Sequence, residues 1–186
     1  IAVGIKPLGV NFRSGESIAF GVNTNYERLY ESFNLAGVKE ITPGEYIYTD
    51  YRMSFYTLSS RPISAGLEIA SGEFWNGSKN TLNTSITVRY NRNLNFGADY
   101  SFNYIDIGGT LIRTNNIGGR VSYAFNPKLN TSLFGQWNDS YNSIILNYRI
   151  NWIPVIGSDF YFVINQFIDT SGKSWKFTDF SAYAKF

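Results

Sequence analysis

The chain has 186 residues and a formal net charge of +2, with no Cys and no His. One domain with a sizeable core is possible at this length, while the missing cysteines exclude a disulfide scaffold and thiolate metal sites. Dispersed Lys and Arg and a small net charge argue against nucleic acid as a partner, and no run approaches the ~18 apolar residues of a membrane-spanning helix. Charged residues make up 16% of the chain, against about 25% in an ordinary soluble domain. Because Ile1 is not an initiator, we expect a mature form or a fragment.

The first 80 residues predict a series of β-strands. Apolar residues alternate with polar ones over residues 1–12, and a second run begins at residues 18–22. Residues 26–35 have a mixed period, so a strand and a short amphipathic helix remain alternatives. Strong strand patterns follow at residues 45–57 and 63–69, each with one apolar and one polar face.

Residues 81–104 carry the clearest pattern. From Leu82 to Tyr90 every second residue is apolar or aromatic, apart from one threonine, and the alternation resumes at Leu94 after a turn at residues 91–93. This predicts a hairpin with one apolar and one polar face. Each arm is about as long as the ~9–11 residues that a tilted strand needs to cross a bilayer.

Alternation continues to the end of the chain. The further strands that we expect lie at residues 119–125, 129–137, 144–152, 159–167 and 177–186, which gives about twelve strands in all. The last of them ends on Phe186 and resembles the terminal signal of outer-membrane barrels.

The connections differ in length in a regular way. Short turns are predicted at residues 59–62, 91–93, 126–128 and 153–158, and longer polar loops at residues 37–44, 71–80, 106–116 and 169–176, with a short one at 138–142. Short and long connections therefore alternate, as in a barrel with short periplasmic turns and longer outside loops. The Greek-key crossovers of a sandwich would break that order.

These patterns predict an all-β fold, an antiparallel up-and-down transmembrane β-barrel of about twelve strands in a single domain over residues 1–186. The apolar face would then meet lipid and the polar face would line the lumen. The alternative is a soluble β-sandwich or barrel, whose apolar face covers a packed core. Alternation alone does not distinguish the two, but the low charge and the order of the connections favour the membrane.

The polar face of the predicted strands carries charges of both signs. The candidate lumen-lining residues are Asp50, Arg52, Glu68, Arg89, Asp99, Arg120 and Arg149. In an open lumen these groups would select solutes by charge; in a plugged one they would pair and fill the interior. Trp137 and Trp152 lie at opposite ends of their strands and are candidates for interfacial aromatics, with core packing as the alternative.

Catalytic chemistry finds little support in these residues. Without His the usual general base is missing, and Asp50 with Glu68 is better explained as lumen carboxylates than as an acid pair. Asp139, Asp169 and Asp179 lie in predicted loops, and a calcium site there would need their oxygens to converge. We therefore expect no enzyme activity, no cofactor and no metal.

Several stretches together resemble a known family. They are "YERLYESFNLAGVKEITPGEY" (residues 26–46), "SGEFWNG" (71–77), "LFGQWN" (133–138), "NYRINWIPVIGSD" (147–159) and "FYFVINQ" (160–166). In this order they are similar to the C-terminal barrel of Gram-negative outer-membrane proteins that carry an N-terminal domain like a family 9 carbohydrate-binding module. The resemblance implies that the chain is the C-terminal part of a longer protein and that further strands precede it. It supplies no catalytic residue.

The expected function is that of an outer-membrane β-barrel, acting as a porin-like conduit or as the membrane anchor of an upstream glycan-binding domain. Its expected partners are outer-membrane lipid and, through the absent domain, a glycan; partner chains are open. The alternative is a soluble β-protein that binds a ligand or partner through aromatic loops such as Phe74, Trp75 and Trp175.

Overall fold

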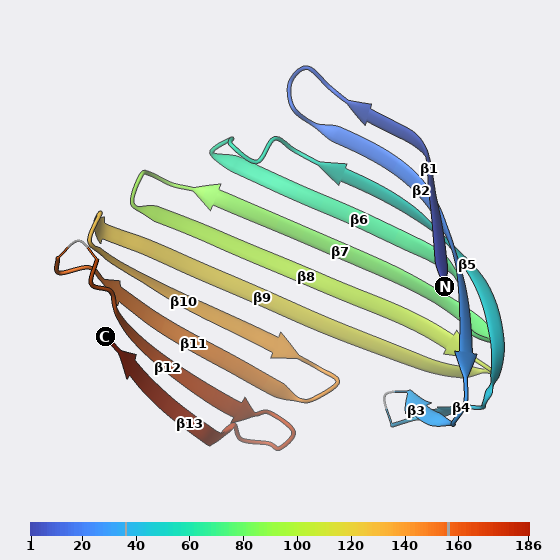
Figure 1. The fold of residues 1–186 in the computed structure, drawn as a ribbon. Helices are drawn as coiled ribbons and strands as arrows, with labels where there is room; N and C mark the ends of the chain where they lie inside the picture. Colours follow the sequence, from blue (N-terminus) through green and yellow to red (C-terminus); the bar gives the residue numbers. More distant parts are fainter. Residues whose placement is uncertain (36, 156) are drawn as a thin grey trace. The chain divides into compact units, whose positions relative to one another are not determined.

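The computed structural model of the chain describes residues 1–35, 37–155 and 157–186. This part of the chain forms thirteen β-strands (Figure 1). Their bounds are β1 (Ala2–Asn11), β2 (Ser17–Leu29), β3 (Phe33–Leu35), β4 (Lys39–Ile41), β5 (Gly44–Tyr56), β6 (Ile63–Phe74), β7 (Gly77–Arg89), β8 (Leu94–Ile107), β9 (Thr110–Asn126), β10 (Leu129–Asn138), β11 (Ser143–Trp152), β12 (Phe160–Asp169) and β13 (Lys176–Lys185). None of the described residues belongs to a helix with the length and apolar character to cross a membrane.

Eleven of the strands form one sheet in the order β1-β2-β5-β6-β7-β8-β9-β10-β11-β12-β13, and β3 pairs with β4 in a small second sheet. The predicted all-β class and the up-and-down antiparallel order are confirmed. The count is thirteen rather than about twelve, because the segment between β2 and β5 adds the β3–β4 hairpin. Residues 26–35 are strands and a turn, so the helical alternative is wrong. Within the described residues the sheet is not closed, since β1 and β13 each pair with one neighbour.

The predicted long loop at residues 37–44 is wrong in part, because it contains β4 and the first residue of β5. Two further long loops are wrong. The stretch 71–80 continues β6 to Phe74 and starts β7 at Gly77, and the stretch 106–116 holds a two-residue turn between β8 and β9. At that turn Gly108 and Gly109 have φ angles of 56° and 77°, the positive pair that a type I′ hairpin requires. The strict alternation of short and long connections therefore fails at these two places. The predicted turn at 153–158 includes Ile156, which lies outside the described residues.

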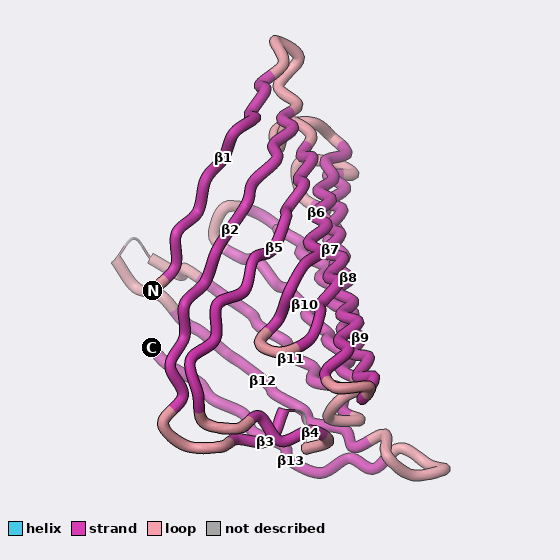
Figure 2. The backbone as a smooth tube through the Cα atoms, turned by 90° about the vertical axis from the view of Figure 1, so that its right-hand side faces the viewer, coloured by secondary structure: helices cyan, strands magenta, loops and turns pink. Residues whose placement is uncertain are grey.

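The described chain divides into two compact units. Unit 1 comprises Ile1–Ser60, Ala65–Thr84 and Ser101–Asn115, and unit 2 comprises Arg61–Ser64, Ser85–Tyr100 and Asn116–Phe186. In unit 1 the long antiparallel strands β1, β2 and β5 follow one another in the sheet, as the tube view shows (Figure 2). Cross-strand partners share a face of the sheet, so the register defines both faces of each unit.

The apolar face of unit 1 is exposed. It is the face that carries Ile47, Tyr51 and Met53 on β5 and their register partners, such as Ile69 on β6. Ile47 is 68% exposed, Met53 54% and Ile69 45%. Among the described residues only five hydrophobic side chains are buried, namely Ile41, Ile105, Ile107, Ile112 and Ile168. The alternating apolar residues of these strands therefore do not form a packed core.

Side chains on the polar face of unit 1 form hydrogen bonds with one another. This is the face that carries Asp50 and its register partners. Ser101 Oγ donates to Asn83 Oδ1 at 2.7 Å, and Thr81 Oγ1 donates to Asn103 Oδ1 at 2.8 Å. Asn103 Nδ2 in turn donates to Thr114 Oγ1 at 3.0 Å. These bonds link side chains from adjacent strands, so polar groups on this face satisfy one another.

One end of this polar face is apolar, and the β3–β4 hairpin lies against it. Alternation puts Ile105 and Ile107 on the same face of β8 as Asn103, and Ile112 on the same face of β9 as Thr114. These isoleucines form a buried cluster with Ile41 of β4, and Phe33 and Leu35 of β3 pack against it. We call this arrangement the hairpin cap. Apolar burial thus holds the cap on the polar side of the sheet.

Unit 2 repeats the two-faced pattern. The register aligns Val121, Leu133 and Tyr148 on one face and Ser122, Ser132 and Arg149 on the other. Val121 is 40% exposed and Leu133 46%. Leu133 and its partners define the apolar face of unit 2, and Arg149 and its partners the polar face.

Candidate functional site

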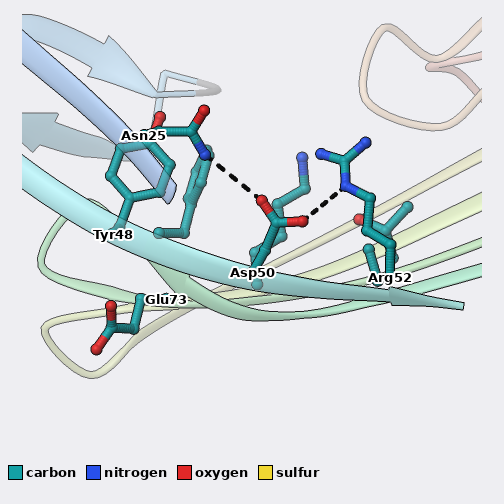
Figure 3. A pocket seen from close by; sticks show the side chains of 9 residues that line it. Asn25, Tyr48, Asp50, Arg52 and Glu73 are labelled. Atoms are coloured by element: carbon teal, nitrogen blue, oxygen red, sulfur yellow. Dashed lines mark hydrogen bonds and ion pairs between the residues drawn. The ribbon is translucent and has the colours of Figure 1, made fainter. Parts of the chain in front are cut away.

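A cavity of about 210 Å³ opens on the polar face of unit 1, between β2, β5, β6 and β7. It is lined by Asn25, Tyr48, Asp50, Arg52, Ala70, Glu73, Phe74, Lys79 and Thr81 (Figure 3). Period-two alternation puts Tyr48, Asp50 and Arg52 on one face of β5, and the register adds Asn25 from β2. Small residues, such as Gly21 opposite Arg52 and the adjacent Ala70, leave the space open.

Asp50 is the centre of the polar network in this cavity. Its Oδ1 atom lies 2.6 Å from Arg52 Nε in an ion pair, and Figure 3 shows the carboxylate between Asn25 and Arg52. Asn23 Nδ2 donates to Oδ1 at 3.3 Å and Asn25 Nδ2 to Oδ2 at 3.5 Å. The Asp50 side chain is 15% exposed and that of Arg52 51%. The carboxylate is therefore satisfied by protein donors, while the guanidinium keeps part of its surface toward solvent.

The other side of the cavity is formed by Lys79, Phe74 and Glu73. Lys79 Nζ lies 4.9 Å from the centre of the Phe74 ring, within the range of a cation–π contact. Glu73 points away from Asp50 (Figure 3), and its Oε2 accepts the backbone N–H of Thr49 at 3.0 Å. Two cations, Arg52 and Lys79, and the Asp50 carboxylate thus face the cavity, whereas Glu73 lies at its edge and points toward the other face of β6.

The packing around Phe74 shows why the stretch "SGEFWNG" contains two glycines. A Cβ atom at Gly72 would lie 2.3 Å from the carbonyl oxygen of Thr49, and one at Gly77 would lie 2.0 Å from that of Asp106. Glycine at both positions therefore permits close approach of backbones. Between them Trp75, at a φ of 50°, stacks edge-on against Phe33 of the hairpin cap with a 5.0 Å centroid distance.

Glu27 connects Trp75 to the cavity. Its Oε2 atom accepts a hydrogen bond from Trp75 Nε1 at 2.9 Å and another from Tyr48 OH at 3.2 Å. Tyr48 also meets Phe74 edge-on at 6.0 Å. Phe74 and Trp75, proposed above as a ligand-binding loop in the soluble alternative, are partly buried in packing, whereas Trp175 is 65% exposed.

The chemistry of this site is that of recognition by charge and hydrogen bonding. The Asp50 carboxylate accepts a charge-assisted hydrogen bond from Arg52 Nε. Among the described residues no group of three or more Asp, Glu, His or Cys could hold a metal ion. The arrangement offers both signs of charge to a polar solute.

The predicted lumen residues fall into two groups. Asp50, Arg52 and Glu68 lie in unit 1, where the first two form an ion pair and Asn83 Nδ2 donates to Glu68 Oε1 at 3.5 Å. The other four, Arg89, Asp99, Arg120 and Arg149, lie in unit 2.

These four side chains of unit 2 have different surroundings. Arg89 Nη1 donates to the carbonyl of Arg61 at 2.9 Å. The carboxylate of Asp99 lies over Gly118, where a Cβ atom would meet both oxygens at 2.5 Å. Arg120 and Arg149 line one cavity. Within unit 2, the cavity thus brings Arg120 and Arg149 together.

The two predicted interfacial tryptophans lie on the apolar face of unit 2. Trp137 pairs with Ile144 and Trp152 with Leu129, at opposite ends of the β10–β11 hairpin. Trp152 is 47% exposed and meets Phe160 edge-on at 6.4 Å.

Sequence reasoning missed Glu27, Lys79 and Asn25 as members of the site. Alternation contained the signal for two of them: Asn25 and Glu27 extend the polar positions between Ile18, Phe20 and Val22 along β2. Lys79 was hidden because the stretch 71–80 was assigned to a loop.

No family model matches the chain, and neither a curated protein nor a solved structure does.

Proposed function

We propose that the chain is an outer-membrane β-barrel, or the C-terminal part of one, that acts as a porin-like conduit or as the membrane anchor of an upstream glycan-binding domain. The observation that carries the proposal is the inverted pattern of the faces. The apolar face is exposed over Ile47, Met53 and Ile69, while the polar face is half-buried and hydrogen-bonded.

A soluble sheet would have the opposite arrangement, because an apolar side chain gains roughly 1.5–3 kcal/mol on full burial. Leaving a row of such side chains in water forgoes that gain at every second residue. In a bilayer the same row meets hydrocarbon and nothing is lost. Residues on the polar face then need partners away from lipid, which the cross-strand hydrogen bonds supply.

The spacing of the tryptophans supports the same proposal. Trp152 pairs with Leu129, and Trp137 lies eight positions further along β10, which is about 27 Å at ~3.4 Å per residue. With a strand tilt of ~35–45° the two rings would be about 19–22 Å apart along the membrane normal, comparable with an apolar band ~25 Å tall between aromatic girdles.

The hairpin cap is relevant to the question whether the proposed barrel acts as a conduit or only as an anchor. Because Phe33, Leu35 and Ile41 lie on the polar side of β8 and β9, a barrel with this face inside would be narrowed at one end by the cap. The first cavity, which Asp50, Arg52 and Lys79 line, lies next to that narrowing through Phe74. A conduit with these features would pass small polar solutes and hold back large ones.

The family resemblance of the sequence supports the anchor reading in particular. Those proteins join a carbohydrate-binding-like domain to a barrel, so the barrel would hold the domain at the outer membrane. The conduit and anchor hypotheses both place the barrel in the membrane and differ only in whether solutes pass through it.

Heat modifiability tests the shared part. The chain is refolded into detergent micelles and run on a denaturing gel with and without boiling. Faster migration of the unboiled sample is expected for a closed barrel, and discrete conductance steps in planar bilayers would then favour conduit over anchor. A chain that is soluble, monomeric and β-rich without detergent would refute the membrane proposal. Aggregation both with and without detergent would indicate that the barrel needs further strands to close. Coexpression with an upstream segment would check this.

A further inference from the structure

We infer that the polar face of unit 2 contains a binding site for a small anion that also carries hydroxyl groups, such as a sugar carboxylate. The site is a second cavity, of about 480 Å³, within the usual volume of small-ligand pockets. The inference rests on the proposed function in that the polar face must be open to solutes.

The lining of this cavity carries two positive charges and no carboxylate. It consists of Asn93, Asn95, Arg120, Ser122, Tyr123, Ala124, Asn130, Thr131, Ser132, Arg149, Asn151 and Tyr161. In the first cavity Arg52 is paired with the Asp50 carboxylate, but in this one no lining carboxylate balances the two arginines. An anion is the solute that would restore the balance.

The two arginines converge from different strands. Arg149 pairs with Ser132, which pairs with Ser122, so Arg149 lies on the same face as Arg120, two strands and two residues away. At ~4.8 Å between strands and ~3.4 Å per residue their Cα atoms are about 12 Å apart. Arginine side chains from both ends therefore flank the two serines, where a carboxylate could accept hydrogen bonds from either fork.

Neither guanidinium is engaged by an acid. Among the described residues no ion pair involves Arg120 or Arg149. Arg120 stacks on Phe134, with its Cζ atom 4.9 Å from the ring centre, which holds the guanidinium plane while leaving its N–H edge available. The nearby Asp99 carboxylate lies against Gly118.

Hydroxyl groups on the ligand are indicated by the uncharged polar side chains of the lining. Ser122 and Ser132 lie opposite each other in register, as do Asn130 and Asn151. Their hydroxyl and amide groups both donate and accept hydrogen bonds, as the hydroxyl groups of a sugar do. Lipid headgroups are not the source, because this face is opposite to the apolar one.

Calorimetric titration of the detergent-refolded full chain tests the site with three probes: D-glucuronate, D-glucose, which lacks the charge, and acetate, which lacks the hydroxyls. Saturable binding is expected for glucuronate, with weaker binding of both others. The variants Arg149→Gln and Arg120→Gln should each weaken glucuronate binding about tenfold, since each removes a charge-assisted interaction. Arg149→Lys should give an intermediate loss, because it keeps the charge without the fork.

Arg13→Gln is the matched control, because Arg13 is exposed in the β1–β2 turn of unit 1. Its glucuronate affinity should equal that of the parent chain. The inference is overturned if the folded parent chain gives no saturable heat with glucuronate, if glucose binds equally tightly, or if both Gln variants bind like the parent. Binding without any conductance would keep the site and refute the conduit, so the two proposals fail separately.

Discussion

Replacement of Ile69 by arginine tests whether the apolar face of unit 1 lies in lipid or in water. Ile69 is 45% exposed and pairs with Met53 of β5. It lies six positions after Ile63, the first residue of β6, which is about 20 Å along the strand. With a tilt of ~35–45° this distance becomes about 14–16 Å of depth, close to the middle of a ~25 Å apolar band.

The expected cost follows from that depth. An arginine on the lipid face costs about 2–4 kcal/mol at the midplane and about 0–1 kcal/mol near the interface. Ile69→Arg should therefore lower the free energy of unfolding by the larger amount and Ile63→Arg, on the same face at the strand end, by the smaller. In water both positions are exposed, and such surface substitutions change stability by only about 0.5 kcal/mol.

Urea titration in phospholipid vesicles, followed by tryptophan fluorescence, measures both variants against the parent chain. The reasoning is refuted if Ile69→Arg and Ile63→Arg lose the same stability to within about 0.5 kcal/mol, since depth would then have no effect.

Two further predictions concern the wall of the first cavity. Gly77→Ala should lower the free energy of unfolding by about 2 kcal/mol or more, because its Cβ atom would collide with the β8 backbone; Gly119→Ala, which meets nothing within 4 Å, should be neutral or stabilising by up to about 1 kcal/mol. Trp75→Phe removes the donor to Glu27 and should cost about 1–2 kcal/mol, whereas Trp175→Phe at an exposed site should stay within about 0.5 kcal/mol. The same urea titration measures all four, and a pair with equal losses would contradict its prediction.

The strands were predictable because alternation is a local property of the chain. Residues 45–57 and 81–104 show it without interruption, and the structure has β5, β7 and β8 there. The prediction failed where both faces of a strand are polar or small. At residues 71–80 the positions that continue the apolar face are all polar, namely Ser71, Glu73, Ser78 and Asn80. The stretch therefore has the composition of a loop, although Gly72 and Gly77 are there to let strands approach.

The candidate site was only half predictable, for a different reason. Alternation places Asp50 and Arg52 on one face of β5, but which strand lies beside it depends on register. That register brings Asn23 opposite Asp50 and Gly72 on its other side. The hairpin cap was also out of reach, because its contacts with Ile105 and Ile107 join segments about 70 residues apart in the sequence.

The strength with which the hairpin cap is attached to the sheet should depend on temperature in a way that the hydrogen-bonded parts of the polar face do not share. Its contact with β8 and β9 consists of isoleucine, leucine and aromatic side chains, and apolar attachment of this kind weakens on cooling. Opening of the cap is thus a local event that can occur while the strands stay paired. In the cold the cap would spend more time detached, and amide hydrogen exchange in β3 and β4 would speed up relative to the sheet.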